Sequence, residues 1–282
     1  QPTYTTEGTV SEFPEWAKTR FEYAADKWDT DWIASSGSTT DADTFYLEVR
    51  WSNLLGPSML AESSPVFKTD SELTYQYLTA QYKVLFDNEL IDVNEGHITF
   101  NSNSNWYQGT DASPGETEYD FVTVALQELG HQLGMTDTHA ALLDTWGVDA
   151  KLGYYDDFLR DESGNRPTAG AGGGDPSNFD ETDDPVYFVG ANATAAYGGN
   201  VPIYAPSPTV IPGVSLMHLN DAGYLMSYGI GPGDAIHTLS DVEWGIFEDL
   251  GWTMTPEPTT AAFALLAAGA AIWVRRRRKA SP

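Results

Sequence analysis

The chain has 282 residues, with 14 Lys and Arg against 41 Asp and Glu, for a formal net charge of −27. Residues 1–255 hold 9 of these basic residues and 40 of the acidic ones, a net charge of −31. A body this acidic repels phosphate backbones, which excludes general nucleic-acid binding. Because the chain has no cysteine, disulfides, zinc–thiolate sites and thiol catalysis are also excluded.

The first hundred residues predict two helices and two strands. Aromatic residues spaced near 3.6 predict a helix over 14–33, with Pro14 in its first turn. Alternating apolar and polar residues predict a strand over 44–51. Apolar periodicity predicts a second helix over 71–87, and a short strand is expected at 98–100.

The rest of the body predicts two further helices around a loop-rich stretch. Asp120 is a plausible N-cap for a helix over 121–134. Residues 136–215 are rich in Gly, Pro and acidic residues and are expected to form mostly loops. A last helix is expected over 238–250, closed by Gly251.

The C-terminal residues 256–282 have a composition of their own. A Pro-Glu-Pro triplet precedes the apolar run 261–274, and the basic run 275–279 follows. As a helix, the apolar run would span about 21 Å, which is short for a bilayer core of about 30 Å. If it inserts, the positive-inside rule places the arginines on the cytoplasmic side. The plain interpretation is a membrane anchor or a basic tail.

This order of triplet, apolar run and arginine cluster resembles the PEP-CTERM sorting signal of bacterial envelope proteins. The resemblance implies export, retention by a short transmembrane segment at 261–274, and cleavage near the triplet by an exosortase-type processing enzyme. The body would then reach the cell envelope or the exterior, and it would meet the membrane only through residues 256–282.

The predicted helix over 121–134 carries the residues with metal chemistry. A zinc hydrolase helix presents two His at i and i+4 on one face, with Glu directly after the first. Here Glu128, His131 and Gly134 match that pattern, whereas Gln127 occupies the first ligand position. The plain alternative is that Glu128 and His131 form an i,i+3 polar pair on an ordinary amphipathic helix.

A second segment lies about 90 residues downstream. His218 precedes the sequence Leu-Met-Ser-Tyr, residues 225–228, by seven residues. With these residues the chain resembles the metzincin metallopeptidases, closest to leishmanolysin-like members, in which a Met-containing turn lies beneath zinc and follows a distant third His. The segment 244–252 also resembles the final helix of that group.

The resemblance implies a zinc site and a general base. His131 and His218 would be zinc ligands, Gln127 would stand at the remaining ligand position, and Glu128 would be the general base. A Gln oxygen is a poorer zinc donor than imidazole, so weak metal binding, weak activity or an inactive module are all expected outcomes.

The same resemblance implies roles for the turn and leaves rivals for one ligand. Met226 would form the floor of the turn, and Tyr228 would approach the metal and steady the transition-state oxyanion, unless it is a packed turn aromatic. Asp137 and His139 are rivals of His218 as the third ligand.

The fold expected from the resemblance is α+β. Residues 1–255 would form one metallopeptidase-like domain, divided near residue 135 into an upper subdomain with a twisted sheet and a loop-rich lower one. The implied activity is that of a secreted zinc-dependent endopeptidase acting on protein or peptide substrates. The alternative is a catalytically inactive peptidase-like binding module of the cell envelope or extracellular matrix.

Residues outside this set have simpler interpretations. His97 and His237 are expected to be surface or structural histidines. A group of acidic residues gives a weak calcium signal because no EF-type loop is present, and a solvated acidic surface is the better interpretation. The group consists of Asp156, Asp157, Asp161, Glu162 and the patch 175–184.

Overall fold

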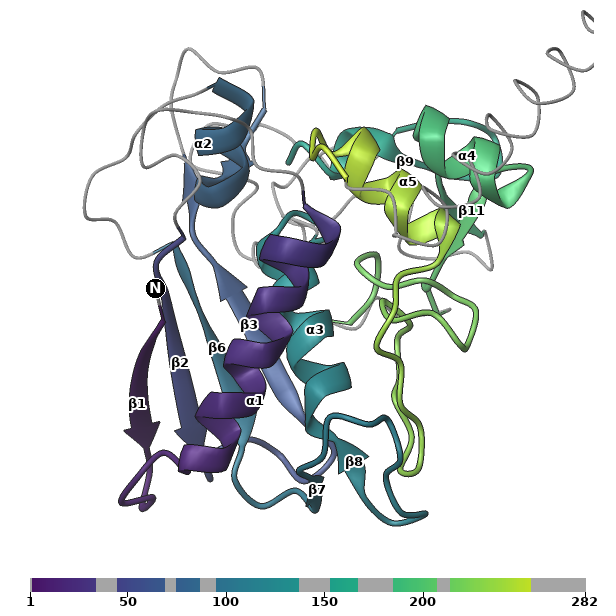
Figure 1. Cartoon of the computed structure of the whole chain (residues 1–282). Coiled ribbons are helices and arrows are strands. Elements are labelled where there is room, and N and C mark those ends of the chain that lie inside the picture. Colours follow the sequence, from purple (N-terminus) through teal and green to yellow (C-terminus); the bar gives the residue numbers. More distant parts are fainter. Residues whose placement is uncertain are drawn as a thin grey trace, which may run out of the picture.

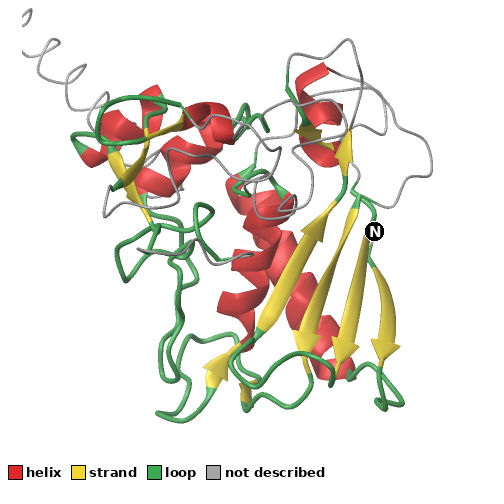
Figure 2. Ribbon diagram, turned by 180° about the vertical axis from the view of Figure 1, so that it is seen from behind, coloured by secondary structure: helices red, strands yellow, loops and turns green. Residues whose placement is uncertain are grey.

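The structure is a computed structural model that describes residues 2–33, 45–68, 75–86, 95–136, 153–166, 185–206 and 214–254. These residues form helices and several sheets, so the predicted α+β class is confirmed at that level (Figure 1). Helix α3, Phe121–Gln132, lies between the large N-terminal sheet and the C-terminal elements (Figures 1 and 2).

The N-terminal part is built on a four-stranded sheet. Its order is β1 (Thr3–Glu7), β2 (Leu47–Ser52), β6 (Gly96–Asn101) and β3 (Ala61–Pro65). The first three strands are parallel, and β3 runs antiparallel to β6 at the edge. Val49 and Ile98 face each other in the register and are fully buried, so apolar burial specifies how β2 and β6 pair.

Two helices cover one face of this sheet, as both views show (Figures 1 and 2). Helix α1, Glu15–Asp26, continues into a π-helical segment, Lys27–Trp32, and packs against α3. The aromatic rings at this junction interlock: Phe121 lies 4.6 Å from Phe100 between ring centroids and 5.3 Å from Trp16. Apolar burial of this kind is the main stabilising term of the layer.

The C-terminal part has its own small sheet. Strands β9 (Leu159–Arg160), β10 (Val186–Phe188) and β11 (Val201–Ile203) are antiparallel, in the order β11-β10-β9. Helices α4 (Ala191–Tyr197) and α5 (Asp241–Asp249) pack against each other beside it (Figure 1). Residues 136–215, expected to form mostly loops, therefore contain short strands and a helix in their described parts.

Shorter elements complete the described chain. They are β4 (Phe67–Lys68), β5 (Tyr77–Leu78), α2 (Thr79–Phe86), β7 (Trp106–Tyr107), β8 (Tyr119–Asp120) and a 3-10 turn at Asp156–Phe158. The predicted helix over 71–87 is therefore wrong in part. Tyr77 and Leu78 pair with β4 as a strand, and the helix begins only at Thr79.

The remaining helix and strand predictions agree with the described elements. Asp120 caps α3, because its side chain accepts a hydrogen bond from the backbone N–H of Thr123 at 2.7 Å. Gly251, at φ +95°, ends the last helix. None of the helices in the described ranges is long and apolar enough to cross a membrane, and the predicted transmembrane run 261–274 lies outside those ranges.

Candidate metal centre

Helix α3 is buried along its whole length and still carries polar side chains at its C-terminal end. The apolar run 121–126 packs into the core, which fixes the helix against its neighbours. Gln127 and His131 then fall on one face, one turn apart, with Glu128 beside them. All three side chains are buried, at 8%, 4% and 6% exposure respectively.

The structure brings His131 and His218 together, although 87 residues separate them. Their Nε2 atoms lie 3.1 Å apart, and the ring planes are at 79° to each other. This is the convergence that the sequence motifs predict. His218 comes from an irregular segment that pairs with Tyr204, since the backbone N–H of Tyr204 donates to the carbonyl of His218 at 2.8 Å.

Each imidazole is oriented by a backbone carbonyl. His131 Nδ1 lies 2.6 Å from the carbonyl oxygen of Met135, and His218 Nδ1 lies 2.6 Å from that of Val214. A carbonyl only accepts, so each Nδ1 carries the proton and each neutral ring leaves a bare lone pair on Nε2. A backbone carbonyl on the far nitrogen is the usual support of a metal-binding histidine.

Protonation of either imidazole ring near neutral pH does not relieve the close approach of the two Nε2 atoms. Burial, helped by the proximity of His218, lowers the pKa of His131 to about 3, and burial lowers the pKa of His218 to about 4. Both rings are therefore neutral near pH 7, and two lone pairs face each other at 3.1 Å. A cation between the Nε2 atoms removes that repulsion.

The separation of the two nitrogens fits zinc. Zn–N bonds of about 2.0–2.1 Å at a tetrahedral angle place two ligand nitrogens about 3.3 Å apart. The observed 3.1 Å is close to that value. Among the described residues, however, no group of three His, Cys, Asp or Glu side chains could hold a metal ion. The donor set found there is therefore two imidazoles.

Glu128 has the position and acidity of a proton carrier. Burial, reinforced by the charge of Glu62 on β3, raises the pKa of Glu128 to about 8. The carboxyl is thus poised to exchange a proton near neutral pH.

Gln127 is tied to the turn that carries Met226. Its Nε2 donates to the carbonyl oxygens of Leu225, at 3.0 Å, and Ser227, at 2.7 Å. The amide therefore crosslinks α3 to the residues on both sides of Met226. A ligand role for Gln127 would have to use its oxygen while its nitrogen keeps these bonds.

Met226 forms a packed floor beneath the helix, as the sequence predicts. The side chain is fully buried, and it lies so close to α3 that a Cβ on Gly130 would be 2.6 Å from its Sδ. A larger residue at 130 would therefore force the Met226 side chain to shift.

Tyr228 lies on the surface beside the turn. Its ring stacks on Tyr204, with centroids 3.9 Å apart and planes at 8°, and it is 47% exposed. Its backbone N–H donates to the carbonyl of Leu219 at 3.4 Å. The stacking agrees with the interpretation of Tyr228 as a turn aromatic, and a role at the metal stays a prediction.

The other residues considered in the sequence have mixed outcomes. Asp137 and His139 fall outside the part of the chain that the structure describes, as does the patch 175–184. The interpretation of a solvated acidic surface is wrong for Asp156 and Asp161, which are only 2% and 9% exposed. Asp161 accepts bonds from the backbone and side chain of Asn165, so local turn bonding explains its burial.

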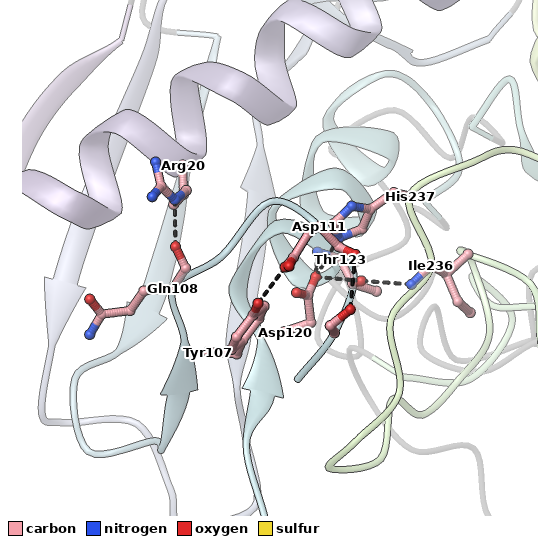
Figure 3. Close-up of polar contacts among 9 residues, drawn as sticks. Arg20, Tyr107, Gln108, Asp111, Asp120, Thr123, Ile236 and His237 are labelled. Carbon is pink, nitrogen blue, oxygen red and sulfur yellow. Dashed lines mark hydrogen bonds and ion pairs between the residues drawn. The ribbon is translucent and has the colours of Figure 1, made fainter. Parts of the chain in front are cut away.

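A clip at the N-terminus of α3 was not predicted as part of the site (Figure 3). His237 Nε2 lies 2.7 Å from Asp120 Oδ1, and the backbone N–H of Ile236 donates to Thr123 Oγ1 at 2.8 Å. The segment after the Met226 turn is thereby fastened to the start of the helix that carries His131. His237 is thus a structural histidine, as expected.

A hollow on the N-terminal part of the body shares no residue with the candidate metal centre. It has a volume of about 370 Å³ and is formed by β1, the segment that leads into α1 and the start of α1. It is lined by Tyr4, Thr5, Thr6, Ser11, Glu12, Phe13, Glu15 and Lys18. None of these residues belongs to the imidazole pair or to its supports.

Comparison of the chain with protein-family models, with curated proteins and with solved structures returns no match. The functional argument therefore depends on the geometry of α3, His218 and the Met226 turn.

Proposed function

We propose that this chain is a zinc-dependent hydrolase of peptide bonds, a leishmanolysin-like metzincin whose metal is held by His131 and His218. The observation that carries the proposal is the pair of Nε2 atoms 3.1 Å apart, each on a ring whose other nitrogen is bound to a backbone carbonyl. Zinc, when bound, would act as a Lewis acid on the scissile carbonyl.

The chain's own residues would supply the proton transfers. Glu128 would take a proton from the attacking water and pass it to the leaving amine. Its burial and its raised pKa, about 8, support both halves of that exchange near neutral pH. The proposal assigns no step to Tyr228, because its ring is stacked on Tyr204.

Strand β3 would position the substrate. It is the edge strand of the sheet and packs against α3, and Glu62 on it lies close enough to influence Glu128. An extended peptide can add to such an edge through main-chain hydrogen bonds. Main-chain binding of this kind would favour a protein or peptide substrate over a small molecule.

Export is part of the same proposal. The PEP-CTERM-like residues 256–282 would direct the body to the cell envelope or the exterior, with an exosortase-type enzyme as processing partner. The net charge of −31 on residues 1–255 would help keep the exported body in solution.

A second candidate function is a catalytically silent binding module that keeps the peptidase fold. Two observations favour it. The amide nitrogen of Gln127 is bound to the carbonyls of Leu225 and Ser227. The described residues also offer two imidazoles where a zinc peptidase has three protein ligands. Loss of a ligand is expected to lower zinc affinity by more than the 10–100-fold typical of a supporting residue.

Zinc titration and casein cleavage test the proposal on four proteins: the native chain, His218→Ala, Gln127→His and His97→Ala. The native chain should bind one zinc weakly and cleave casein in a chelator-sensitive way. His218→Ala should lose both properties, and Gln127→His should tighten zinc binding by more than about a hundredfold. His97→Ala is the matched control, since His97 lies on β6, and it should behave as the native chain.

Two results would decide against the enzyme. If the native chain binds zinc and neither it nor Gln127→His cleaves casein, the silent module is the better function. If Gln127→His, shown by circular dichroism to be folded, binds no zinc, the metal site itself is wrongly assigned.

A further inference from the structure

Glu243 on α5 is a fully buried carboxylate with two separate sets of bonds. Its Oε2 accepts from the backbone N–H and the hydroxyl of Ser240, both at 2.8 Å, and so completes a capping box. Its Oε1 accepts from the backbone N–H of Met226 at 2.7 Å. The helix cap uses Oε2, so Oε1 is available to bind the backbone of the Met226 turn.

Met226, whose backbone N–H donates to Glu243, lies in the turn that joins the His218 segment to helix α3 through hydrogen bonds. The carbonyl of Met226 accepts from the backbone N–H of Leu219, at 2.8 Å, and Leu219 directly follows His218. The carbonyls on either side of Met226, those of Leu225 and Ser227, bind the amide of Gln127. A shift of Met226 would therefore be transmitted to both His218 and α3.

A helix cap alone does not explain such a residue. Burying a carboxylate costs free energy unless hydrogen bonds replace its water, and burial raises the pKa of Glu243 against the effect of these bonds. Asp120, the N-cap of α3, uses one oxygen, Oδ1, both for its cap and for its distant partner His237, whereas Glu243 places the cap and the distant partner on separate oxygens. The second oxygen of Glu243 thus fits a role beyond the end of α5.

We propose that Glu243 is a positioning residue of the metal centre, which acts through Met226 to set the place of His218 and of the helix face that carries His131. The proposal depends on the proposed function in that the imidazole pair binds a metal. It adds a residue from the last helix, distant from the motifs on α3, to the machinery of the site.

The test compares Glu243→Gln with Ser240→Ala. Gln keeps the size of the side chain but has one accepting oxygen, so it cannot accept from the backbone N–H groups of both Ser240 and Met226. Ser240→Ala weakens the same cap and leaves the bond to Met226 intact. Zinc affinity, measured by competition with a chromophoric chelator on folded protein, should fall about tenfold in Glu243→Gln and stay within about twofold of native in Ser240→Ala. Equal affinities in the two variants would overturn the proposal.

A second measurement separates this proposal from the function on which it depends. The measurement is NMR on metal-free protein, which follows the methionine methyl groups and the histidine rings. Glu243→Gln should shift the methyl signal of Met226, assigned with Met226→Leu, and the ring signals of His218. Ser240→Ala should shift neither. If the native chain binds no zinc, the proposed function fails and these signals still decide the positioning role. If Glu243→Gln does not fold, Glu243→Asp replaces it, since the shorter side chain cannot span both partners. Native signals in the folded variant would refute the role.

Discussion

Helix α3 is held in two different ways on its two sides. Toward the sheet and α1, rings pack around its N-terminal end, where Phe121 lies against Phe100, Trp106 and Trp16. A few hydrogen bonds add to this packing nearer its C-terminal end, such as those from Gln132 Nε2 to Ser63 and to the carbonyl of His97. Toward the C-terminal part, directional bonds hold it, and Trp252 Nε1 donates to the carbonyl of Leu133 at 2.6 Å in the same way that Gln127 binds the turn.

The difference follows from what each side must do. Apolar contacts are non-directional, so they hold a helix against a sheet without fixing the angle of any one side chain. A metal site needs its ligands in place to within a fraction of an ångström, which bonds with fixed donors and acceptors provide. We infer that the sheet side supplies stability and that the turn side supplies geometry.

Phe121→Ala should have the largest effect on stability. Phe121 is fully buried among four aromatic rings, and truncating such a residue costs about 3–5 kcal/mol of the free energy of unfolding. Urea unfolding followed by circular dichroism measures the loss. Leu54→Ala is the control, since Leu54 is 70% exposed and its truncation should change stability by less than about 0.5 kcal/mol. A loss below about 1 kcal/mol for Phe121→Ala would remove the distinction between the two sides.

Gly130→Ala should have a smaller effect and act on the geometry. The new Cβ would meet Met226 Sδ at 2.6 Å, Met226 Cε at 3.1 Å and Phe247 Cζ at 3.4 Å, and the Met226 side chain that must move is fully buried. Crowding of this kind costs about 1–3 kcal/mol, and the helix preference for Ala over Gly returns up to about 1 kcal/mol. A net loss of about 1–2 kcal/mol is expected.

The control for that change is Gly229→Ala, three residues past Met226. A Cβ at Gly229 meets nothing within 4 Å, so its unfolding free energy should match that of the native chain. If both variants have native stability and native zinc affinity, the close contact between α3 and Met226 has no role in the site.

The sequence could predict the sheet side of α3 better than the turn side. The Asp120 cap and the apolar run 121–126 are local signals, and the structure uses both. Strands β1 and β3 gave no such signal, because their sequences, TYTTE and AESSP, are polar. They form strands by pairing with β2 and β6, whose apolar residues are recognisable.

The turn side depends on partners that are distant in sequence. That His218 would meet His131 was expected from the likeness of the Met226 segment to a known turn, and local periodicity gave no such indication. The bonds of Gln127 and Glu243 were not predictable, since their carbonyl and amide partners lie 98, 100 and 17 residues away on irregular backbone. Any buried Gln or Glu must find partners, but its own sequence neighbours do not identify them.

The smallest expected effect compares one substitution at two places. Thr123 Oγ1 donates to Asp120 Oδ1 at 2.7 Å and accepts from the backbone N–H of Ile236 at 2.8 Å, within the clip at the start of α3 (Figure 3). Thr99, on β6, is as deeply buried, but its hydroxyl has no hydrogen-bond partner among the residues that the structure describes. Valine has nearly the same shape and lacks the hydroxyl in both cases.

Thr123→Val should lower the free energy of unfolding by about 1 kcal/mol, because it removes the part-buried hydrogen bond from the backbone N–H of Ile236 and the bond to Asp120. Thr99→Val should leave stability unchanged or raise it, because an unpartnered buried hydroxyl is replaced by a methyl group. Chemical denaturation of the two variants under one set of conditions measures the difference directly. Opposite signs would show that the hydroxyl of Thr123 stabilises the clip and that the hydroxyl of Thr99 does not stabilise the sheet. A loss of equal size at both positions would mean that Thr99 has a polar partner or that the Thr123 bonds contribute nothing specific.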